Sequence, residues 1–583
     1  MWGSPLSLGA RAAGVKIQII DFNMLATRFG LVCLALLCGT RTGAADPPSS
    51  PCPTFPAPAD GASVVAPGLA PALATVRRQL AALVGSEPLP GLVATVVYDQ
   101  TTLLSAGWGR ANASDAASSA APDGGSLVRV ASISKVFTSL LLYKLRDAGV
   151  VGLDDAVADH IPAFSVRTPY AGAHPITLGQ LASHTSGLPR EGPFPCNLDG
   201  RCDAAAVYRR MARQYVALPQ NQRFHYSNFG FGLLGQALAA AAAKNGSSSS
   251  SSPSPSFEDL IAREVLTPLG IGGTFAEPLD PARQARVAQG IDTPGAGGPA
   301  KLGGLGWSAP CGGLWASAED VARMMKLMFR TDAAADGGAQ LLAGATVREA
   351  LAPAVLLRDG FEAVGSPWEM KFVVPPDAPT AAAAGGGVWT SSKQGELNGY
   401  RSAVTLVPEL KLGVFVSALQ SDVSDSSVWS LNLTAQLVPP LLALLRAHAQ
   451  AAPPPPLPPR HAALVGEYGP ADELVTVSYS VDGATLVADL HGSGANLTAF
   501  KIDDGAGGAG GASGGADDDA AGVGDVMVLR ALSLGGGQGR AGCRWLDDGI
   551  DQELLYFQFA AAGAPGSAVQ SLLFMGGKYD RRT

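Results

Sequence analysis

A run of prolines divides the 583-residue chain into two parts that fold separately. Residues 451–459 read AAPPPPLPP, and proline lacks the backbone N–H group that a helix or sheet interior requires. Such a run forms an extended, semi-rigid polyproline segment that joins neither neighbouring sheet. We therefore expect one domain before this linker, over residues 70–447, and another after it, over residues 460–583.

The N-terminus has the pattern of a secretory leader within residues 1–46. Arg28 precedes a short apolar run that small residues follow, which predicts a signal peptide over residues 29–45. The run is shorter than the roughly 20 residues that a membrane-spanning helix needs. Residues 1–23 lack this pattern, and we interpret them as a mispredicted extension, with an unusually long leader as the alternative. Residues 47–69 are rich in proline and alanine and predict an extended lead-in.

Secretion exposes cysteines to an oxidising compartment, where disulfides form. Cys196 and Cys202 flank a short polar loop and are the best candidates for a disulfide. A zinc site is the alternative, but no histidine or second cysteine pair stands near them. Sequons for N-glycosylation, which fit a secreted protein, begin at Asn112, Asn245, Asn432 and Asn496.

Hydrophobic periodicity predicts the order of elements before the proline run. The expected elements are a helix at about 71–83, strands at 92–98 and 102–108, a helical middle, strands at 388–393, 401–407 and 412–419, and a helix at 428–447. This order predicts an α+β fold in which an antiparallel sheet is flanked by N- and C-terminal helices and carries an all-helical insertion. Alternating residues after the linker predict a small all-β domain, either a sheet or a barrel.

Ser132 and Lys135 form an S-x-x-K pattern at the start of a predicted helix. The spacing puts the two side chains next to each other, with the hydroxyl near the positive end of the helix dipole. An amine in that position can accept the hydroxyl proton, so the pair is a candidate nucleophile and base. The structural alternative is a serine that begins the helix and a lysine that reaches water.

Tyr226 and Asn228 form a Y-x-N pattern between two predicted helices. A phenol whose pKa is lowered by nearby cations can act as an acid or a base. The amide two residues later can bind a lysine or a substrate amide. The structural alternative is a buried tyrosine followed by an asparagine that caps the next helix.

Lys393 and Gly395 form a K-x-G pattern at the end of a predicted strand. The lysine adds positive potential, and the glycine lets a substrate approach the backbone. The next backbone N–H group, that of Glu396, can form an oxyanion hole together with that of Ser132. The structural alternative is a strand that ends in an exposed lysine.

Taken together and in this order, the three patterns resemble the serine β-lactamase and penicillin-binding protein superfamily, in particular its class C β-lactamase-like branch. The resemblance covers about residues 70–447. It includes HTSGL at 184–188, HYSNFGFGLLG at 225–235, PCGGLWASAEDVARMM at 310–325 and KQGELNGYRS at 393–402. Residues 460–583 resemble the small β domain of secreted fungal-type β-lactamase-like proteins.

The resemblance implies a role for each polar side chain. Ser132 would be the acylated nucleophile, and Lys135 and Tyr226 would share the work of the general base. Asn228 would orient Lys135 and a substrate amide. Lys393 would keep Tyr226 acidic and attract an anionic group of the substrate.

The backbone would contribute as well, since the resemblance places the N–H groups of Ser132 and Glu396 around the oxyanion and Gly395 beside the substrate. Two residues depart from the family pattern. Gln394 stands where threonine or another small residue is frequent, and Glu396 puts an anion where small residues are common, which is expected to disfavour anionic substrates such as β-lactams. His184 belongs to HTSGL and is expected to be structural rather than part of a Ser-His-Asp triad.

These observations predict a secreted serine hydrolase that forms an acyl-enzyme on an ester or amide, without a cofactor or a metal ion. Its partner is a small-molecule or peptide substrate; esterase, D-amino-acid peptidase and β-lactamase activities all stay open. The alternative is a catalytically idle relative that binds a peptide or glycan in the same cleft or serves as a scaffold. The net charge of −8 without a basic block gives no support to nucleic-acid binding, and no stable membrane insertion is expected. The oligomeric state stays open.

Overall fold

The computed structural model describes residues 58–582 with internal gaps. The gaps are 87–88, 113–119, 194–201, 246–254, 292–298, 301–302, 331–339, 359, 374–387, 422–425, 452–460, 472, 480–485, 491–492, 500–525, 534–553, 560–568 and 575–576. The predicted signal peptide and nearly all of the proline run therefore lie outside the described residues. None of the helices in the described part is both long enough and apolar enough to cross a membrane.

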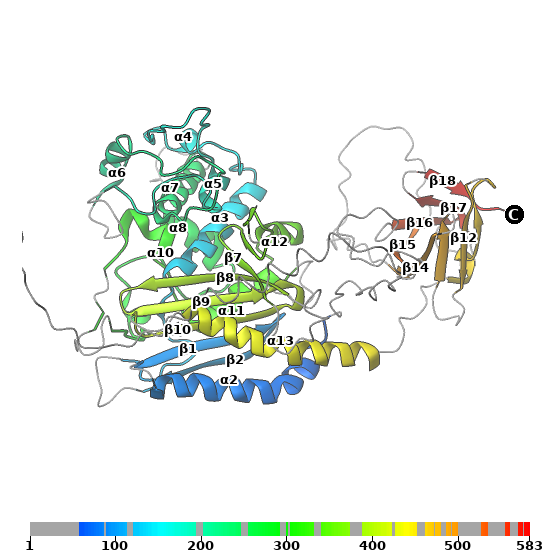
Figure 1. Cartoon of the computed structure of the whole chain (residues 1–583), viewed down its shortest axis with the longest axis horizontal. Coiled ribbons are helices and arrows are strands. Elements are labelled where there is room, and N and C mark those ends of the chain that lie inside the picture. The colour runs from blue at the N-terminus through cyan, green and yellow to red at the C-terminus, as the bar shows by residue number, and fades with distance from the viewer. Residues whose placement is uncertain are drawn as a thin grey trace, which may run out of the picture. The chain divides into compact units, whose positions relative to one another are not determined.

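The main sheet has eight described strands in the order β2-β1-β10-β9-β8-β7-β6-β5, and all neighbours are antiparallel (Figure 1). Its strands are β1 Gly91–Tyr98, β2 Thr101–Gly109, β5 Val355–Leu356, β6 Glu362–Val364, β7 Glu369–Val373, β8 Val388–Leu397, β9 Tyr400–Val407 and β10 Leu412–Ala418. The N-terminal hairpin therefore pairs with strands from the far end of the domain, which confirms the predicted fold class.

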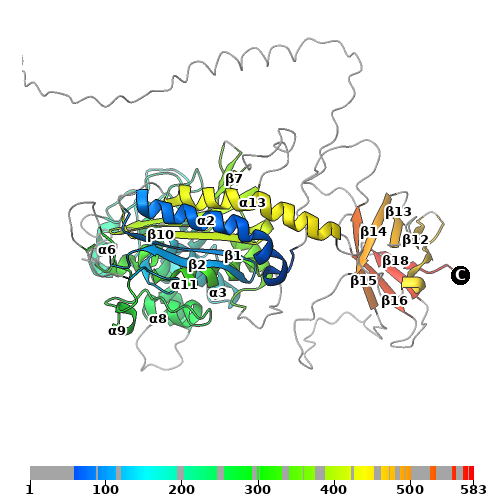
Figure 2. The same cartoon turned by 90° about the horizontal axis from the view of Figure 1, so that it is seen from below.

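Helices cover both faces of this sheet. α2 (Ala66–Ser86) and α13 (Ser426–Ala451) run side by side over one face (Figure 2), and α11 (Ala318–Phe329) packs against the other. β1 is buried along its whole length because its alternating side chains enter two cores. Val96 packs with α2 and α13, whereas Val97 belongs to the larger core on the helical side.

The middle of the domain is mainly helical. Its elements are the 3-10 turn η3 (Ala131–Ile133), α3 (Ser134–Asp147), α4 (Val157–His160), α5 (Leu178–Ala182), α6 (Ala204–Met211), α7 (Asn228–Asn245), α8 (Phe257–Ile261), α9 (Pro281–Gln284), α10 (Ala309–Gly312) and α12 (Gly344–Ala350). The prediction of an all-helical insertion was wrong in detail. β3 (Val128–Arg129) pairs with β4 (Trp315–Ala316), and β5 to β7 extend the main sheet.

The extended lead-in predicted over residues 47–69 was also wrong for its last part. A π-helical turn, η2 (Gly61–Val65), begins there and continues into α2. The side chain of Asp60 accepts a hydrogen bond from the Ser63 N–H group at 2.6 Å, which caps the turn. Val65 and Leu69 are fully buried. Burial of this apolar face outweighs the low helix propensity of a proline-rich composition.

The second sheet consists of eight described strands in sequential order, all antiparallel. They are β11 Gly466–Tyr468, β12 Val475–Tyr479, β13 Leu486–Leu490, β14 Ser493–Ala499, β15 Val526–Ser533, β16 Leu554–Phe559, β17 Val569–Phe574 and β18 Gly577–Asp580. The last strand also bonds to the first: the Gly469 N–H group donates to Asp580 O at 2.9 Å, and that of Arg582 donates to Glu467 O at 2.8 Å. The sheet thus closes on itself around a separate apolar core.

Candidate active site

Ser132 lies in η3, the turn that leads into α3. The turn is held at both ends by Leu314: its carbonyl accepts the Val130 N–H group at 3.1 Å, and its own N–H group donates to Ser134 Oγ at 2.9 Å. Ala131, just before Ser132, has φ = +49°, a left-handed conformation that is costly for a residue with a Cβ atom. The surrounding hydrogen bonds therefore fix a strained backbone next to the predicted nucleophile.

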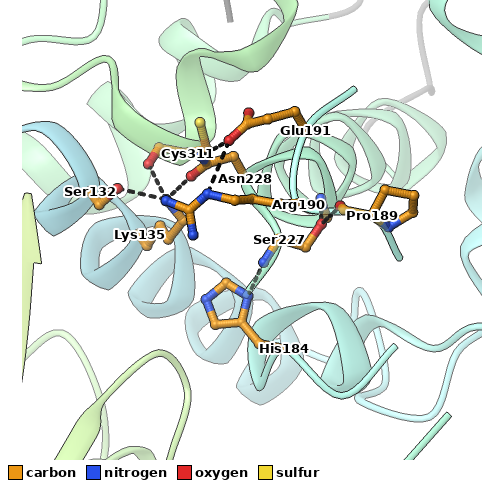
Figure 3. Close-up of polar contacts among 10 residues, drawn as sticks. Ser132, Lys135, His184, Pro189, Arg190, Glu191, Ser227, Asn228 and Cys311 are labelled. Carbon is orange, nitrogen blue, oxygen red and sulfur yellow. Dashed lines mark hydrogen bonds and ion pairs between the residues drawn. The ribbon is translucent and has the colours of Figure 1, made fainter. Parts of the chain in front are cut away.

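Lys135 is fully buried and points back at Ser132 (Figure 3). Its Nζ atom lies 3.0 Å from Ser132 Oγ and 2.8 Å from Asn228 Oδ1. A third contact, at 2.7 Å, is with the carbonyl oxygen of Cys311 in α10. The S-x-x-K spacing thus places the two side chains next to each other as predicted, and burial excludes the alternative of a lysine that reaches water.

Tyr226 lies between two lysines. The Nζ atoms of Lys135 and Lys393 are each 4.9 Å from the centroid of its ring. Burial raises the pKa of the phenol, but the positive charges of the two lysines lower it, and hydrogen bonding with Lys135 and Ser132 acts in the same direction. The net pKa of Tyr226 is below its ordinary value, so the site favours the phenolate.

His184 holds the segment that carries Tyr226. Its Nδ1 atom accepts the Ser227 N–H group at 3.0 Å, and its carbonyl oxygen accepts that of His225 at 2.8 Å. Burial, reinforced by Lys135 and other nearby cations, lowers the pKa of His184 well below its ordinary value. The ring is therefore neutral, and the proton sits on Nε2, which has no hydrogen-bond partner among the described residues. This arrangement fits the structural role predicted for His184 and not a catalytic triad.

Asn228 connects Lys135 to a carboxylate that sequence reasoning missed. While its Oδ1 atom accepts from Lys135, its Nδ2 atom donates to Glu191 Oε1 at 2.7 Å (Figure 3). The loop of Glu191 is held against the start of α7, because the Asn228 N–H group donates to Arg190 O at 2.8 Å. Two fixed partners thus determine which way the amide faces. Only the tertiary fold brings Glu191 to this position, and no local pattern indicated it.

Lys393 on β8 is paired with a second unpredicted carboxylate. Its side chain is 1% exposed, and its Nζ atom lies 2.7 Å from Glu369 Oε1 on the neighbouring strand β7. Burial lowers the pKa of Lys393, but Glu369 and Tyr226 raise it, and the net pKa is above its ordinary value. Lys393 is therefore a permanent cation. The alternation in EMKFV, residues 369–373, was the available signal for this strand.

The end of β8 lies against the Ser132 turn. β7 pairs with β8 only as far as Ser392, while the pairing with β9 continues to Leu397. A Cβ atom on Gly395 would be 2.3 Å from Val130 O and 2.8 Å from Ser132 N. Glycine is therefore required here for close packing against the turn itself, while the predicted approach of a substrate to Gly395 stays a prediction. This packing brings together the two backbone segments proposed for the oxyanion hole, those of Ser132 and Glu396.

The side chain of Glu396, the residue after Gly395, is 58% exposed and lies 3.3 Å from Arg401.

The other predicted sites are less fully described. Cys196 lies outside the described residues, so its pairing with Cys202 stays a prediction. The sequons stay predictions as well: the side chains of Asn245 and Asn432 are exposed, Asn112 is half-buried, and the side chain of Asn496 is outside the described part.

Comparison with known proteins identifies the family. Residues 76–432 match the family model described as "Beta-lactamase". The chain belongs to the β-lactamase family. Its members are serine hydrolases, and the superfamily predicted from the three short patterns is confirmed.

Among curated relatives, this chain is 30% identical over 339 residues to "Beta-lactamase-like protein 2" of Dictyostelium discoideum. The match covers 57% of this chain and 56% of the relative. It is 31% identical over 218 residues to "D-alanyl-D-alanine-carboxypeptidase/endopeptidase AmpH" of Escherichia coli K12, covering 36% of this chain and 50% of the relative. The matches thus span about half of the length of these two relatives. The octameric penicillin-binding protein homologue of Pyrococcus abyssi shares the fold, with a TM-score of 0.50, 18% identity and coverage of 87% of this chain and 99% of that one.

Proposed function

We propose that this protein is a serine hydrolase that forms an acyl-enzyme at Ser132 on an ester or amide substrate. The observation that carries the proposal is the 3.0 Å separation of Ser132 Oγ from the buried Lys135 Nζ. A hydroxyl becomes an effective nucleophile when a base within hydrogen-bond reach accepts its proton. Membership in a family of serine hydrolases supports the same reaction.

In this proposal Lys135 and Tyr226 together activate Ser132: Lys135 orients the hydroxyl, and Tyr226 accepts its proton. Asn228 Oδ1 and Cys311 O hold the ammonium group of Lys135 3.0 Å from Ser132 Oγ, where it orients the hydroxyl. The lowered pKa of Tyr226 supports the phenolate as the group that accepts the proton.

In the first step, Ser132 Oγ attacks the carbonyl carbon of the substrate while its proton passes to Tyr226. The negative charge on the carbonyl oxygen is stabilised by the backbone N–H groups of Ser132 and Glu396. The bond to the leaving group then breaks, and the leaving group takes the proton from Tyr226. A water molecule next attacks the acyl-enzyme, its proton passes through Tyr226 to Ser132, and the free acid leaves.

The substrate in this proposal is a small molecule or a peptide, and the enzyme works after secretion. The signal pattern at residues 29–45, the four sequons and the Cys196–Cys202 pair support an extracellular location. The similarity to a bacterial D-alanyl-D-alanine carboxypeptidase/endopeptidase supports a peptide substrate, while esters and β-lactams stay candidates.

The test is covalent labelling. Incubation with a fluorophosphonate probe should modify one serine, and digestion with trypsin should place the adduct on the peptide of residues 130–135. The matched variant Ser132→Ala should stay unlabelled. A parallel incubation with a penicillin probe reports whether the same site accepts a β-lactam. A folded wild-type protein that reacts with neither probe and hydrolyses no ester would instead be the catalytically idle binding protein or scaffold.

A further inference from the structure

The ammonium group of Lys393 already has partners inside the protein. An ammonium group carries three N–H bonds. One points to Glu369 Oε1 at 2.7 Å and another to the carbonyl oxygen of Gln394 at 3.2 Å. The Nζ atom also lies 4.9 Å from the centroid of the Tyr226 ring. Because Lys393 is also only 1% exposed, its ammonium group is poorly accessible to a group that enters from the solvent.

The charge of Lys393 is compensated as well. Glu369 comes from β7, the strand next to β8, and its carboxylate lies in direct contact with the ammonium group. An approaching anion therefore meets a neutral ion pair rather than an isolated cation. It also meets the negative end of that pair first, since the side chain of Glu369 is 28% exposed whereas Lys393 is buried.

Two arginines of the same region, Arg401 and Arg190, are also accompanied by carboxylates. Arg401 lies 3.3 Å from Glu396, the residue that follows the glycine packed on the Ser132 turn. Arg190, whose guanidinium group is 4.8 Å from the centroid of the Tyr226 ring, lies 3.4 Å from Glu191. Apart from Lys135, the cations named here are therefore each paired with a carboxylate, so an entering carboxylate gains little from them.

We propose that this site selects acyl substrates that carry no carboxylate next to the scissile bond, because Glu369 occupies the place at Lys393 that such a carboxylate would take. The inference rests on the proposed function and names its substrate class: neutral or cationic esters and amides. Peptides that end in a free carboxylate next to the cleaved bond, and penicillins, are poor substrates.

The experiment compares two ester substrates that differ in one group. Both are the same acyl-amino acid depsipeptide, one ending in a carboxamide and the other in a free carboxylate. The ratio of their kcat/KM values is measured for the full chain and for Glu369→Gln. The wild type should prefer the carboxamide. Glu369→Gln should raise the relative kcat/KM of the carboxylate form by about tenfold or more, the scale of one charge-assisted hydrogen bond.

Two further variants make the outcome decisive. Glu362→Gln removes a carboxylate on β6 that pairs with Lys371 at 2.8 Å, and it should leave the ratio unchanged. Glu369→Ala frees Lys393 without leaving an amide behind and should act in the same direction as Glu369→Gln. An unchanged ratio in both Glu369 variants, with melting curves showing that they are folded, would overturn the inference, as would a wild-type preference for the carboxylate. Failure of the wild type to cleave either ester would overturn the proposed function and the inference with it.

Discussion

The rings of His184 and Tyr226 are stacked, with their centroids 4.4 Å apart and their planes 26° from parallel. The same histidine accepts the backbone N–H groups on both sides of this tyrosine, those of His225 and Ser227. Its own backbone has φ = +58°, so the peptide is turned sharply to make these contacts. A neutral aromatic ring thus positions the proposed base without adding another cation beside Lys135.

Replacing His184 by asparagine should flatten the dependence of stability on pH. The pKa of the folded histidine lies well below the ordinary value of 6.5, so on acidification the unfolded chain takes up a proton first. The contribution of neutral His184 to the free energy of unfolding is complete above about pH 6.5. It is lost as pH falls from there towards the pKa of the folded histidine, by at most about 1.4 kcal/mol per pH unit.

Asparagine suits this test because its amide oxygen can accept the Ser227 N–H group and it tolerates a left-handed backbone. Denaturant unfolding between pH 5 and 8 should show a steeper loss of stability on acidification for the wild type than for His184→Asn. The control is His174→Asn, which alters an exposed histidine. If His184→Asn and the wild type respond to pH alike, His184 is not held neutral by the fold.

Replacing Lys393 by methionine should move the pH dependence of catalysis. Lys393 is one of the two charges that lower the pKa of Tyr226, and its removal leaves Glu369 unpaired, which also disfavours the phenolate. Activity that requires the phenolate rises with pH, so the rising limb of kcat/KM should shift to higher pH in Lys393→Met. Lys371→Met, on the neighbouring strand, should leave the profile in place. A limb that stays fixed in both variants would exclude Tyr226 as the titrating base.

Removal of Glu191 should slow the acylation step. Without its carboxylate, the Asn228 amide loses one of the two partners that orient it, and only Lys135 still favours the amide oxygen on its side. Loss of a charge-assisted hydrogen bond corresponds to roughly a 10- to 100-fold effect, and we expect it in kcat for Glu191→Ala, with little change in KM. Glu191→Gln keeps an acceptor for Asn228 Nδ2 and should recover most of the rate. A Glu191→Ala variant as fast as the wild type would show that Glu191 is not needed to position the Asn228 amide.

The closed sheet after the proline run should be dispensable for acylation. All the proposed catalytic side chains precede the linker, and α13 ends at Ala451. A chain that stops at Ala451 should still react with a small fluorophosphonate at Ser132. Its solubility and its preference among large substrates are expected to change if the second domain covers part of the first. A truncated chain that is folded by circular dichroism but inert to the probe would show that the second domain completes the site.

Local patterns predicted the elements that local interactions create. The start of α11 is one example: Ser317 Oγ accepts the Asp320 N–H group at 3.1 Å, and Asp320 Oδ2 accepts that of Ser317 at 3.0 Å. A serine followed by acidic residues is a strong helix-start signal, and α11 begins at the residue after this serine. The neighbouring positions of Ser132 and Lys135 could be predicted for the same reason, since they depend only on helical spacing.

The rest of the site arises from contacts between distant segments. The carbonyl of Cys311 is 176 residues away from Lys135 in the sequence, and every residue has such a carbonyl, so no pattern could single it out. Glu369 reaches Lys393 because β7 adds to the sheet next to β8, a strand that was not predicted. Strand pairing and loop docking, rather than residue type, decided which carboxylates joined the lysines.

The most direct measurement is to trap the acyl-enzyme itself. The full chain is mixed with an activated neutral ester, stopped with acid within seconds, digested with trypsin and analysed by tandem mass spectrometry. The account predicts one acyl group, on Ser132 and not on Ser134 of the same peptide, and none in Ser132→Ala. Turnover of the ester in the Ser132→Ala variant at the wild-type rate, or acylation at a different residue, would contradict it.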